Sequence, residues 1–162
     1  MRLDDEIVSN YRQSRVAFLK GDMWQAEYFY RLNREDNSVE LYYEVDLPEH
    51  LMFVHPLATV LGRATYGDFL CVYQNVGVGS DLDGNRPVLG TGVVLFPGAK
   101  VLGKTKIGSN VFVTANTVVQ NVEIPDNSVV FSRTMPFGGT VICGWKPTKR
   151  SVIRDVFKVL NG

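Results

Sequence analysis

The sequence predicts a mainly β protein: a parallel β-helix with short amino-terminal helices and a carboxy-terminal helix. Two observations support this prediction. An apolar residue recurs every six positions in the middle of the chain, and segments near both ends follow a helical period instead. The 162 residues are 45% hydrophobic, which is enough for one folded unit with a core. We expect a helical segment and lead-in at 1–44, the β-helix domain at 45–140, and a tail with a capping helix at 141–162.

The six-residue repeat is clearest from residue 89 onward. An apolar residue every six positions does not suit an α-helix of 3.6 residues per turn. It suits a coil with three flat sides, one hexapeptide on each, whose apolar residue points inward. Six consecutive matches disfavour the alternative, an ordinary β-sandwich with chance spacing. The apolar positions are Leu89, Leu95, Val101, Ile107, Val113 and Val119, and the small or β-branched positions four further on are Val93, Ala99, Thr105, Val111 and Thr117.

The repeat is broken between Val78 and Val88 by a cluster of Gly, Asp and Pro residues at 79–87. Such a cluster is typical of a loop. Because a solenoid is a rigid platform, a loop that interrupts it often carries function. We expect this loop to line a ligand site.

The segments outside the repeat have their own signals. Two short helices are predicted before about residue 35, with Gly21 ending the first and Asp22 capping the second. Residues 39–45 are rich in β-branched and aromatic side chains and predict extended chain. Residues 148–160 predict a helix that caps the last coil, with a partner-binding helix as the alternative. Its apolar stripe consists of Val152, Ile153, Val156, Phe157 and Leu160.

The charge balance excludes some classes of partner. Lys and Arg number 17, as do Asp and Glu, so no net field attracts nucleic acid or an anionic membrane. The amino terminus does not resemble a signal peptide, and no apolar run approaches the roughly 20 residues that span a bilayer. We expect a cytoplasmic protein. Cys71 and Cys143 are then expected to be buried thiols rather than a disulfide.

Two segments of the repeat resemble a known family. Residues 55–62 read HPLATVLG and residues 73–79 read YQNVGVG. With the hexapeptides, they resemble the serine acetyltransferase group of hexapeptide acyltransferases over about residues 45–135. In that family a histidine stands seven residues before a glycine, as His55 stands before Gly62. The resemblance implies a left-handed parallel β-helix, an acetyl-CoA-dependent O-acetyltransferase activity, and a homotrimer.

The resemblance implies that His55 is the catalytic base. It would remove the proton from an acceptor hydroxyl, which then attacks the thioester carbonyl of acetyl-CoA. Histidine ordinarily titrates near neutrality, and such a base contributes about 10² to 10⁴ in rate. The alternative is a histidine that merely occupies a coil corner. A carboxylate should orient the imidazole; Asp46 is the best match, with Glu49 as a substitute.

The resemblance also implies that acetyl-CoA lies in a groove between two subunits, against small residues on successive coils. Lys104 and Lys149 are expected to meet the nucleotide phosphates, and no metal is implied. The small positions that carry over are Gly79, Gly98, Ala99 and Ala115.

The identity of the acceptor stays open. Relatives that use serine carry a second histidine before a proline in the loop, where this chain has Arg86 before Pro87. Arginine does not accept a proton, but its planar fork can clamp a carboxylate or bind sugar hydroxyls. We expect Arg86, Gln74 and Asp81 to bind the acceptor. Serine and a sugar destined for a surface polysaccharide are nearly equal candidates for the acceptor.

Two other functions compete with this one. The first is a non-catalytic β-helix scaffold in which His55 is incidental. The second is a zinc carbonic anhydrase on the same fold, which needs three histidines at each site, whereas this chain has two in all.

A trimer is also expected from the three-sided geometry, because some flat sides would leave an apolar patch on an isolated subunit. The residues assigned to these sides are Leu70, Val72, Tyr73, Phe112 and Phe131.

Overall fold

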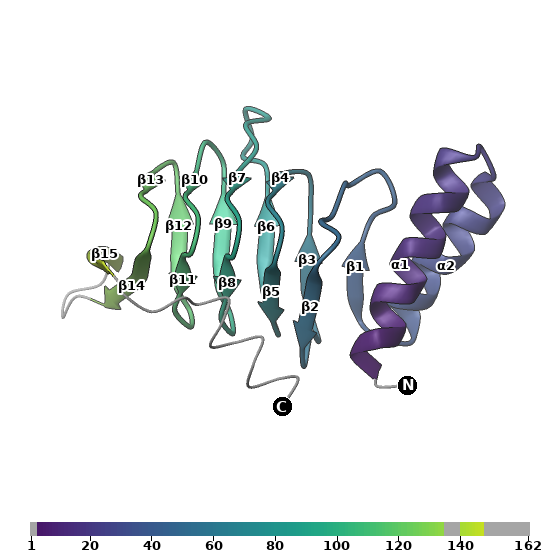
Figure 1. Cartoon of the computed structure of the whole chain (residues 1–162), viewed down its shortest axis with the longest axis horizontal. Helices are drawn as coiled ribbons and strands as arrows, with labels where there is room; N and C mark the ends of the chain where they lie inside the picture. Colours follow the sequence, from purple (N-terminus) through teal and green to yellow (C-terminus); the bar gives the residue numbers. More distant parts are fainter. Residues whose placement is uncertain (1–2, 135–139, 148–162) are drawn as a thin grey trace.

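The computed structural model describes residues 3–134 and 140–147, with the backbone alone for 3–4, 132–134 and 140–147. The chain forms a parallel β-solenoid of three flat sheets, with two helices packed at its amino-terminal end (Figure 1). The helices are α1 (Leu3–Leu19) and α2 (Met23–Glu35). This confirms the predicted fold class and is consistent with a left-handed β-helix.

The strands of each sheet stack along the solenoid. Sheet A contains β1 (Val39–Leu41), β3 (Thr59–Leu61), β6 (Gly77–Gly79), β9 (Lys100–Leu102) and β12 (Val118–Gln120). Sheet C contains β4 (Thr65–Tyr66), β7 (Val88–Leu89), β10 (Lys106–Ile107) and β13 (Glu123–Ile124). Sheet B contains β2 (Leu51–Val54), β5 (Leu70–Tyr73), β8 (Val94–Leu95), β11 (Phe112–Val113), β14 (Ser128–Thr134) and β15 (Thr140–Pro147).

Each coil passes from sheet A to sheet C and then to sheet B, so the solenoid has three edges, here named the A-to-C, C-to-B and B-to-A corners. Val94 pairs with Phe112, eighteen residues later, which equals three hexapeptides. Cys71 pairs with Val94, twenty-three residues later. The five additional residues belong to the predicted loop, which projects from the A-to-C corner between β6 and β7 (Figure 1).

The predicted inward positions form the core. All six apolar positions of the repeat are at most 3% exposed, and the five positions four residues later are 0% exposed. Short β-branched side chains fill the narrow interior of the coil without voids. The hexapeptide period therefore identifies the core residues correctly.

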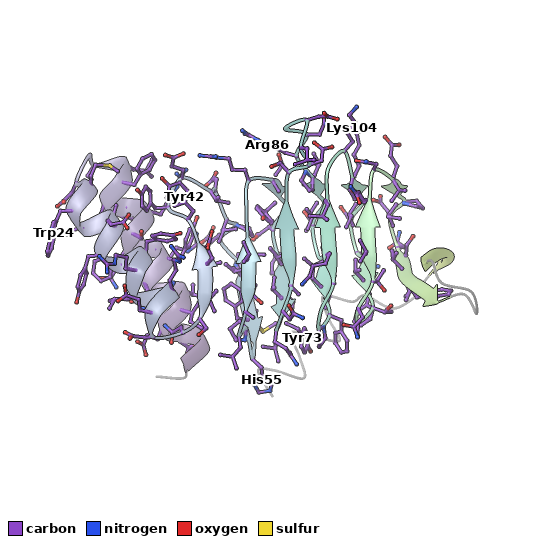
Figure 2. All side chains as sticks on the ribbon, turned by 180° about the vertical axis from the view of Figure 1, so that it is seen from behind. Trp24, Tyr42, His55, Tyr73, Arg86 and Lys104 are labelled. Atoms are coloured by element: carbon purple, nitrogen blue, oxygen red, sulfur yellow. The ribbon has the colours of Figure 1, made fainter. Side chains whose placement is uncertain are left out.

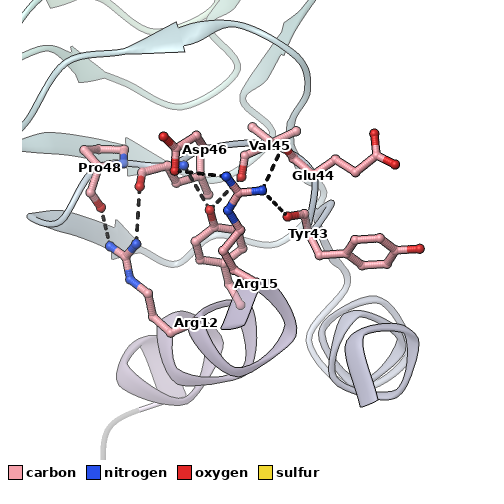
Figure 3. Close-up of polar contacts among 9 residues, drawn as sticks. Arg12, Arg15, Tyr43, Glu44, Val45, Asp46 and Pro48 are labelled. Atoms are coloured by element: carbon pink, nitrogen blue, oxygen red, sulfur yellow. Dashed lines mark hydrogen bonds and ion pairs between the residues drawn. The ribbon is translucent and has the colours of Figure 1, made fainter. Parts of the chain in front are cut away.

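The two helices close the first coil. Asp22 caps α2 by accepting a hydrogen bond from the Gln25 N–H at 3.1 Å, as predicted. Figure 3 shows Arg12 and Arg15 of α1 donating to main-chain carbonyls of the segment that follows β1, between residues 43 and 48. No further coil lies on that side to donate hydrogen bonds to these carbonyls. The two arginines supply the donors that the end of a solenoid lacks.

The structure corrects one prediction and adds an element. Leu70 and Val72, which were assigned to an outer side, point into the core and are 1% and 0% exposed. Strands β14 and β15 form an antiparallel pair that the sequence did not predict. The predicted capping helix at 148–160 and Lys149 lie outside the described residues.

Cys71 is a buried free thiol, as predicted, whereas the side chain of Cys143 lies outside the description. Across the part of the chain that the structure describes, no helix has the length and apolar character needed to cross a membrane.

Candidate functional site

His55 lies in a widened turn at the B-to-A corner, between β2 and β3. Val54 pairs with Tyr73 and Val60 pairs with Gly77, so this turn has two more residues than the same turn one coil later. His55 has a left-handed φ of 51°, which is uncommon outside glycine. Its side chain is exposed and projects from the lower edge of the solenoid (Figure 2). It makes no hydrogen bond or ion pair with another described residue, so its ring nitrogens are open to a ligand.

Three residues of the following coils continue from His55 in register along the same corner: Gln74, Pro97 and Ala115. Neighbouring strands are about 4.8 Å apart, so these three steps span about 14 Å. Ala115 is exposed, and the Oε1 atom of Gln74 is buried without a partner among the described residues. An exposed imidazole at the end of a straight edge of small and uncharged residues fits an extended, thread-like ligand.

At two of the predicted cofactor positions, Ala99 and Gly98, the fold alone explains why the residue is small. Ala99 is 0% exposed; its N–H donates to Phe96 O at 3.0 Å and its carbonyl accepts from Gly77 N–H at 3.0 Å. The Ala99 side chain therefore lies in the core, and a role beside the cofactor stays a prediction. Gly98 has a φ of 76°, and a Cβ there would lie 2.2 Å from Asn116 Oδ1. The corner requires a left-handed residue at this position, which Gly98 supplies here and Asn75 and Asn116 supply in the neighbouring coils.

The loop at the A-to-C corner is organised by Asp81. Its Oδ1 accepts hydrogen bonds from the N–H groups of Asp83 at 3.1 Å and Asn85 at 2.9 Å, and the Asn85 amide donates to both carboxylate oxygens. The hydrogen bonds from the Asn85 side chain lower the pKa of Asp81, with smaller contributions from the backbone donors. Asp81 therefore serves first to hold the loop in shape.

The side chains beside this loop form a basic pocket of about 450 Å³. Arg86 and Lys104 are both exposed and line it, so the residue predicted for the acceptor and the residue predicted for the cofactor lie together. Lys106 also lines it but is paired with Glu123 at 2.7 Å. The pocket is therefore suited to an anionic group.

The predicted site residues divide between two corners. His55, Gln74, Gly98 and Ala115 occupy the B-to-A corner, and Gly79, Asp81, Arg86 and Lys104 occupy the A-to-C corner. Figure 2 shows His55 at one edge of the solenoid and Arg86 and Lys104 at the opposite edge. Within one chain, these two groups do not meet.

The structure does not pair His55 with the expected carboxylate. Asp46 lies 3.5 Å from Arg15, and its side chain is 87% exposed (Figure 3). Neither Asp46 nor Glu49 makes an ion pair with His55 in the described structure. Within the described chain Asp46 and His55 do not pair, because the segment around Asp46 docks against α1; the Asp46 assignment stays a prediction.

A different histidine has a carboxylate partner. His50 Nδ1 lies 2.8 Å from Asp68 Oδ2, the His50 N–H donates to Asp68 Oδ1 at 2.8 Å, and the ring stacks on Phe69. The pair lies at the C-to-B corner. Its eighteen-residue separation equals three hexapeptides and is one residue short of the local coil, and this spacing is the signal in the sequence that would have identified it.

Among the residues that the structure describes, no group of three or more His, Cys, Asp or Glu side chains could hold a metal ion.

Comparison with known proteins finds similarity to serine acetyltransferases. No protein-family model matches the chain. Serine acetyltransferase of Staphylococcus aureus is 34% identical over 104 residues, which is 62% of this chain and 48% of that protein. Serine acetyltransferase of Staphylococcus epidermidis is 33% identical over 93 residues, or 55% and 44%. The chain spans about half the length of the curated relatives it matches.

Solved structures agree with the fold. Serine acetyltransferase from Brucella abortus superposes with a TM-score of 0.74 at 20% identity, covering 87% of this chain and 56% of that one. Its complex with coenzyme A gives a TM-score of 0.72 at 19% identity, covering 86% and 55%. The chain is thus similar in sequence to serine acetyltransferases over part of its length and shares the β-solenoid fold of the solved ones.

Proposed function

We propose that this chain is an acetyl-CoA-dependent O-acetyltransferase of the serine acetyltransferase type, with His55 as the base. The observation that supports it best is the corner geometry: an unpartnered, exposed imidazole stands at one end of a straight edge that fits an extended ligand. Relatives named serine acetyltransferase, one of them solved with coenzyme A, support acetyl-CoA as the donor.

The proposed reaction is direct transfer. His55 takes the proton of the acceptor hydroxyl as the oxygen attacks the thioester carbonyl. The carbon–sulfur bond then breaks, the acetyl group stays on the acceptor oxygen, and the CoA sulfur leaves and takes a proton from the imidazolium. A base placed on a rigid corner needs little reorganisation for these transfers.

We propose further that the complete site forms between subunits of a homotrimer. The two corners that carry the predicted residues flank sheet A, so a cyclic assembly packed around this sheet brings the loop of one subunit to the His55 corner of the next. Gly79 supports this arrangement. A Cβ at Gly79 would meet nothing within 4 Å and its φ is not left-handed, so nothing in the isolated chain requires a glycine there.

The acceptor is proposed to be serine or a sugar hydroxyl, with Arg86 contributing to its recognition. Arg86 stands where a histidine precedes the proline in relatives that use serine, which keeps the sugar as an equal candidate. A panel of serine, homoserine, nucleotide sugars and free glycans, assayed by thiol release from acetyl-CoA, tests both. Turnover with none of them, together with no binding of acetyl-CoA by calorimetry, would favour the scaffold function.

The oligomeric state has its own test. Light scattering coupled to size exclusion should give a mass of three chains, or a multiple of three, at micromolar concentration. A monomer with full transferase activity would contradict the shared site, because one chain keeps the loop and His55 apart.

A further inference from the structure

A lysine of sheet A extends toward the corner that carries His55. Lys100 is the first residue of β9, and because Val101 points into the core, Lys100 starts from the outer face of the sheet. Its ammonium donates hydrogen bonds to the main-chain carbonyl of Asn75 and, at 3.2 Å, to Asn75 Oδ1. Asn75 follows Gln74 in the B-to-A corner. Lys100 therefore brings a positive charge to an edge whose own residues are uncharged.

Gly77 leaves the space that the Lys100 side chain occupies. The two residues pair on neighbouring strands. A Cβ at Gly77 would lie 2.9 Å from Lys100 Cδ, and the three heavy atoms nearest to it would all belong to Lys100. The φ of Gly77 is not left-handed, so the backbone conformation does not require a glycine there. The missing side chain at this position lets Lys100 lie across β6 instead of extending into solvent.

The charge of Lys100 is not neutralised by its own chain. Among the side chains that the structure describes, no carboxylate forms an ion pair with Lys100, whereas Lys106 pairs with Glu123 at 2.7 Å. Glu40, in the same outward row of sheet A, lies 3.7 Å from Arg34 instead. Burial lowers the pKa of Lys100. A cation that is partly desolvated and has only neutral partners costs free energy, and such groups concentrate at functional sites.

The ammonium lies beside the turn of the proposed base. The Asn75 N–H donates to the Leu57 carbonyl at 2.8 Å, and the Leu57 N–H donates to the His55 carbonyl at 2.8 Å. The residue that Lys100 binds is thus in direct contact with the turn that carries His55. Their coils are one strand spacing apart, about 4.8 Å. Because Lys100 reaches the corner across sheet A, its charge lies on the side where the proposed neighbouring subunit packs.

We propose that Lys100 is a further catalytic residue, whose ammonium stabilises the negative charge that develops on the thioester oxygen. This inference rests on the proposed function and adds a role to the same site. As the acceptor oxygen attacks, the carbonyl π electrons move onto the thioester oxygen, to which the ammonium donates a hydrogen bond. When the carbon–sulfur bond breaks, that electron pair re-forms the carbonyl and Lys100 keeps its proton. An ammonium has three N–H donors, and Asn75 accepts from two of them.

Lys100→Met tests this role, because it removes the charge and keeps a stem of similar length over Gly77. It should lower kcat at least tenfold and leave the dissociation constant of acetyl-CoA within twofold, since the oxygen carries its charge only in the transition state. The loss should be the same for every acceptor of the panel that the parent protein acetylates, because the thioester oxygen does not change with the acceptor. Lys100→Arg, which keeps a cation, should recover part of the lost turnover. Thiol release, calorimetry with acetyl-CoA and thermal melting measure these quantities.

Two further variants serve as controls. Lys20→Met removes an exposed lysine directly after α1 and should keep kcat within twofold of the parent. If Lys100→Met does not assemble as the parent does, as judged by light scattering, Lys100→Gln decides the question by the same tenfold criterion. Glutamine keeps a donor for Asn75 but carries no charge.

Several results would overturn the inference. A kcat within twofold of the parent in Lys100→Met, whatever its Tm, would show that Lys100 only holds the turn at Asn75. A loss confined to serine and homoserine would mean that the ammonium binds the carboxylate of the acceptor. His55→Asn is measured in parallel. Turnover that is lost in His55→Asn and kept in Lys100→Met would remove this inference alone, whereas a parent protein without turnover would remove the proposed function with it.

Discussion

The C-to-B and B-to-A corners are built from the same repeat, but they differ in the hydrogen-bond partners of their polar side chains. At the C-to-B corner, successive coils satisfy one another. Ser109 N–H donates to Asp126 Oδ1 at 2.7 Å, Thr91 N–H donates to Ser109 Oγ at 3.2 Å, and Asn110 donates to Asn127 at 2.7 Å. The polar groups of this corner are used in holding the coils together.

At the B-to-A corner, two polar side chains remain without partners in the described structure. These are His55, in its widened turn, and Gln74, whose buried Oε1 accepts no hydrogen bond. A buried acceptor left open costs free energy unless a ligand or a neighbouring subunit supplies a donor. The difference between the corners teaches that groups not used in folding mark the edge available for function.

The largest expected effect is at His55. His55→Asn should lower turnover by about 10² to 10⁴ while the fold and the affinity for acetyl-CoA stay unchanged, because the base acts in the transition state. Asparagine tolerates the left-handed φ of 51°, so the turn is preserved. Steady-state kinetics with calorimetry measure both quantities. The control is His50→Asn at the satisfied corner, which should keep turnover within twofold; equal losses in both variants would contradict the assignment.

The next effect is on stability, at the C-to-B corner. A Cβ at Gly90 would lie 2.6 Å from the carbonyl carbon of Gly108, and backbone cannot move aside cheaply. Gly90→Ala should therefore cost about 1–3 kcal/mol, or roughly 3–10 °C in Tm. Gly79→Ala, compared in dissociated monomeric protein, is the matched control for the fold of one chain, because a Cβ there meets nothing of its own chain within 4 Å. Thermal melting should show a lower Tm for Gly90→Ala and almost no change in Tm for Gly79→Ala. Equal shifts would show that Gly90 is packed no more tightly than Gly79.

A smaller effect is expected at the loop. Arg86→Ala should raise the KM for the acceptor about tenfold, roughly 1.4 kcal/mol, and leave the KM for acetyl-CoA within twofold. Lys104→Ala, in the same pocket, should weaken acetyl-CoA instead. Initial-rate measurements with each substrate varied in turn separate the two. A loss of acetyl-CoA affinity in both variants would show that the whole pocket serves the cofactor.

The sequence predicted the coil and its core because both follow from one period. The inward positions from Leu89 to Val119 must be apolar in every coil, so each repeat is independent evidence for the others. Upstream, one slip of a residue exchanges the inside and the outside of a strand. This is why Leu70 and Val72 were assigned to the wrong side.

The site was less predictable because it depends on contacts between distant segments. Asp46 was placed beside His55 by its position in the sequence, but Arg15 of α1 draws that segment toward the helices. Ala99 has the small side chain expected of a groove, yet the same size also suits the core. A hexapeptide pattern fixes which coil a residue occupies, but not whether a side chain at its corner finds a partner.

The smallest expected effect is the pH dependence of the stability that Asp68 contributes at the C-to-B corner. Burial opposes the ionisation of Asp68, but hydrogen bonds from the backbone and ring of His50 and from the backbone of Phe69 together lower its pKa. A carboxyl whose pKa is lower in the folded state stabilises the fold at pH values above its pKa in the unfolded state, about 3.9. This contribution is lost as the pH falls through the folded pKa.

Asp68→Asn should therefore be less stable than the parent at pH 7. The difference should be below about 1 kcal/mol, because the pair is partly exposed to solvent. Urea unfolding at pH 7 and near pH 3 should show this difference shrinking on acidification. A difference that stays constant or grows would mean that the Asp68 charge does not stabilise this corner.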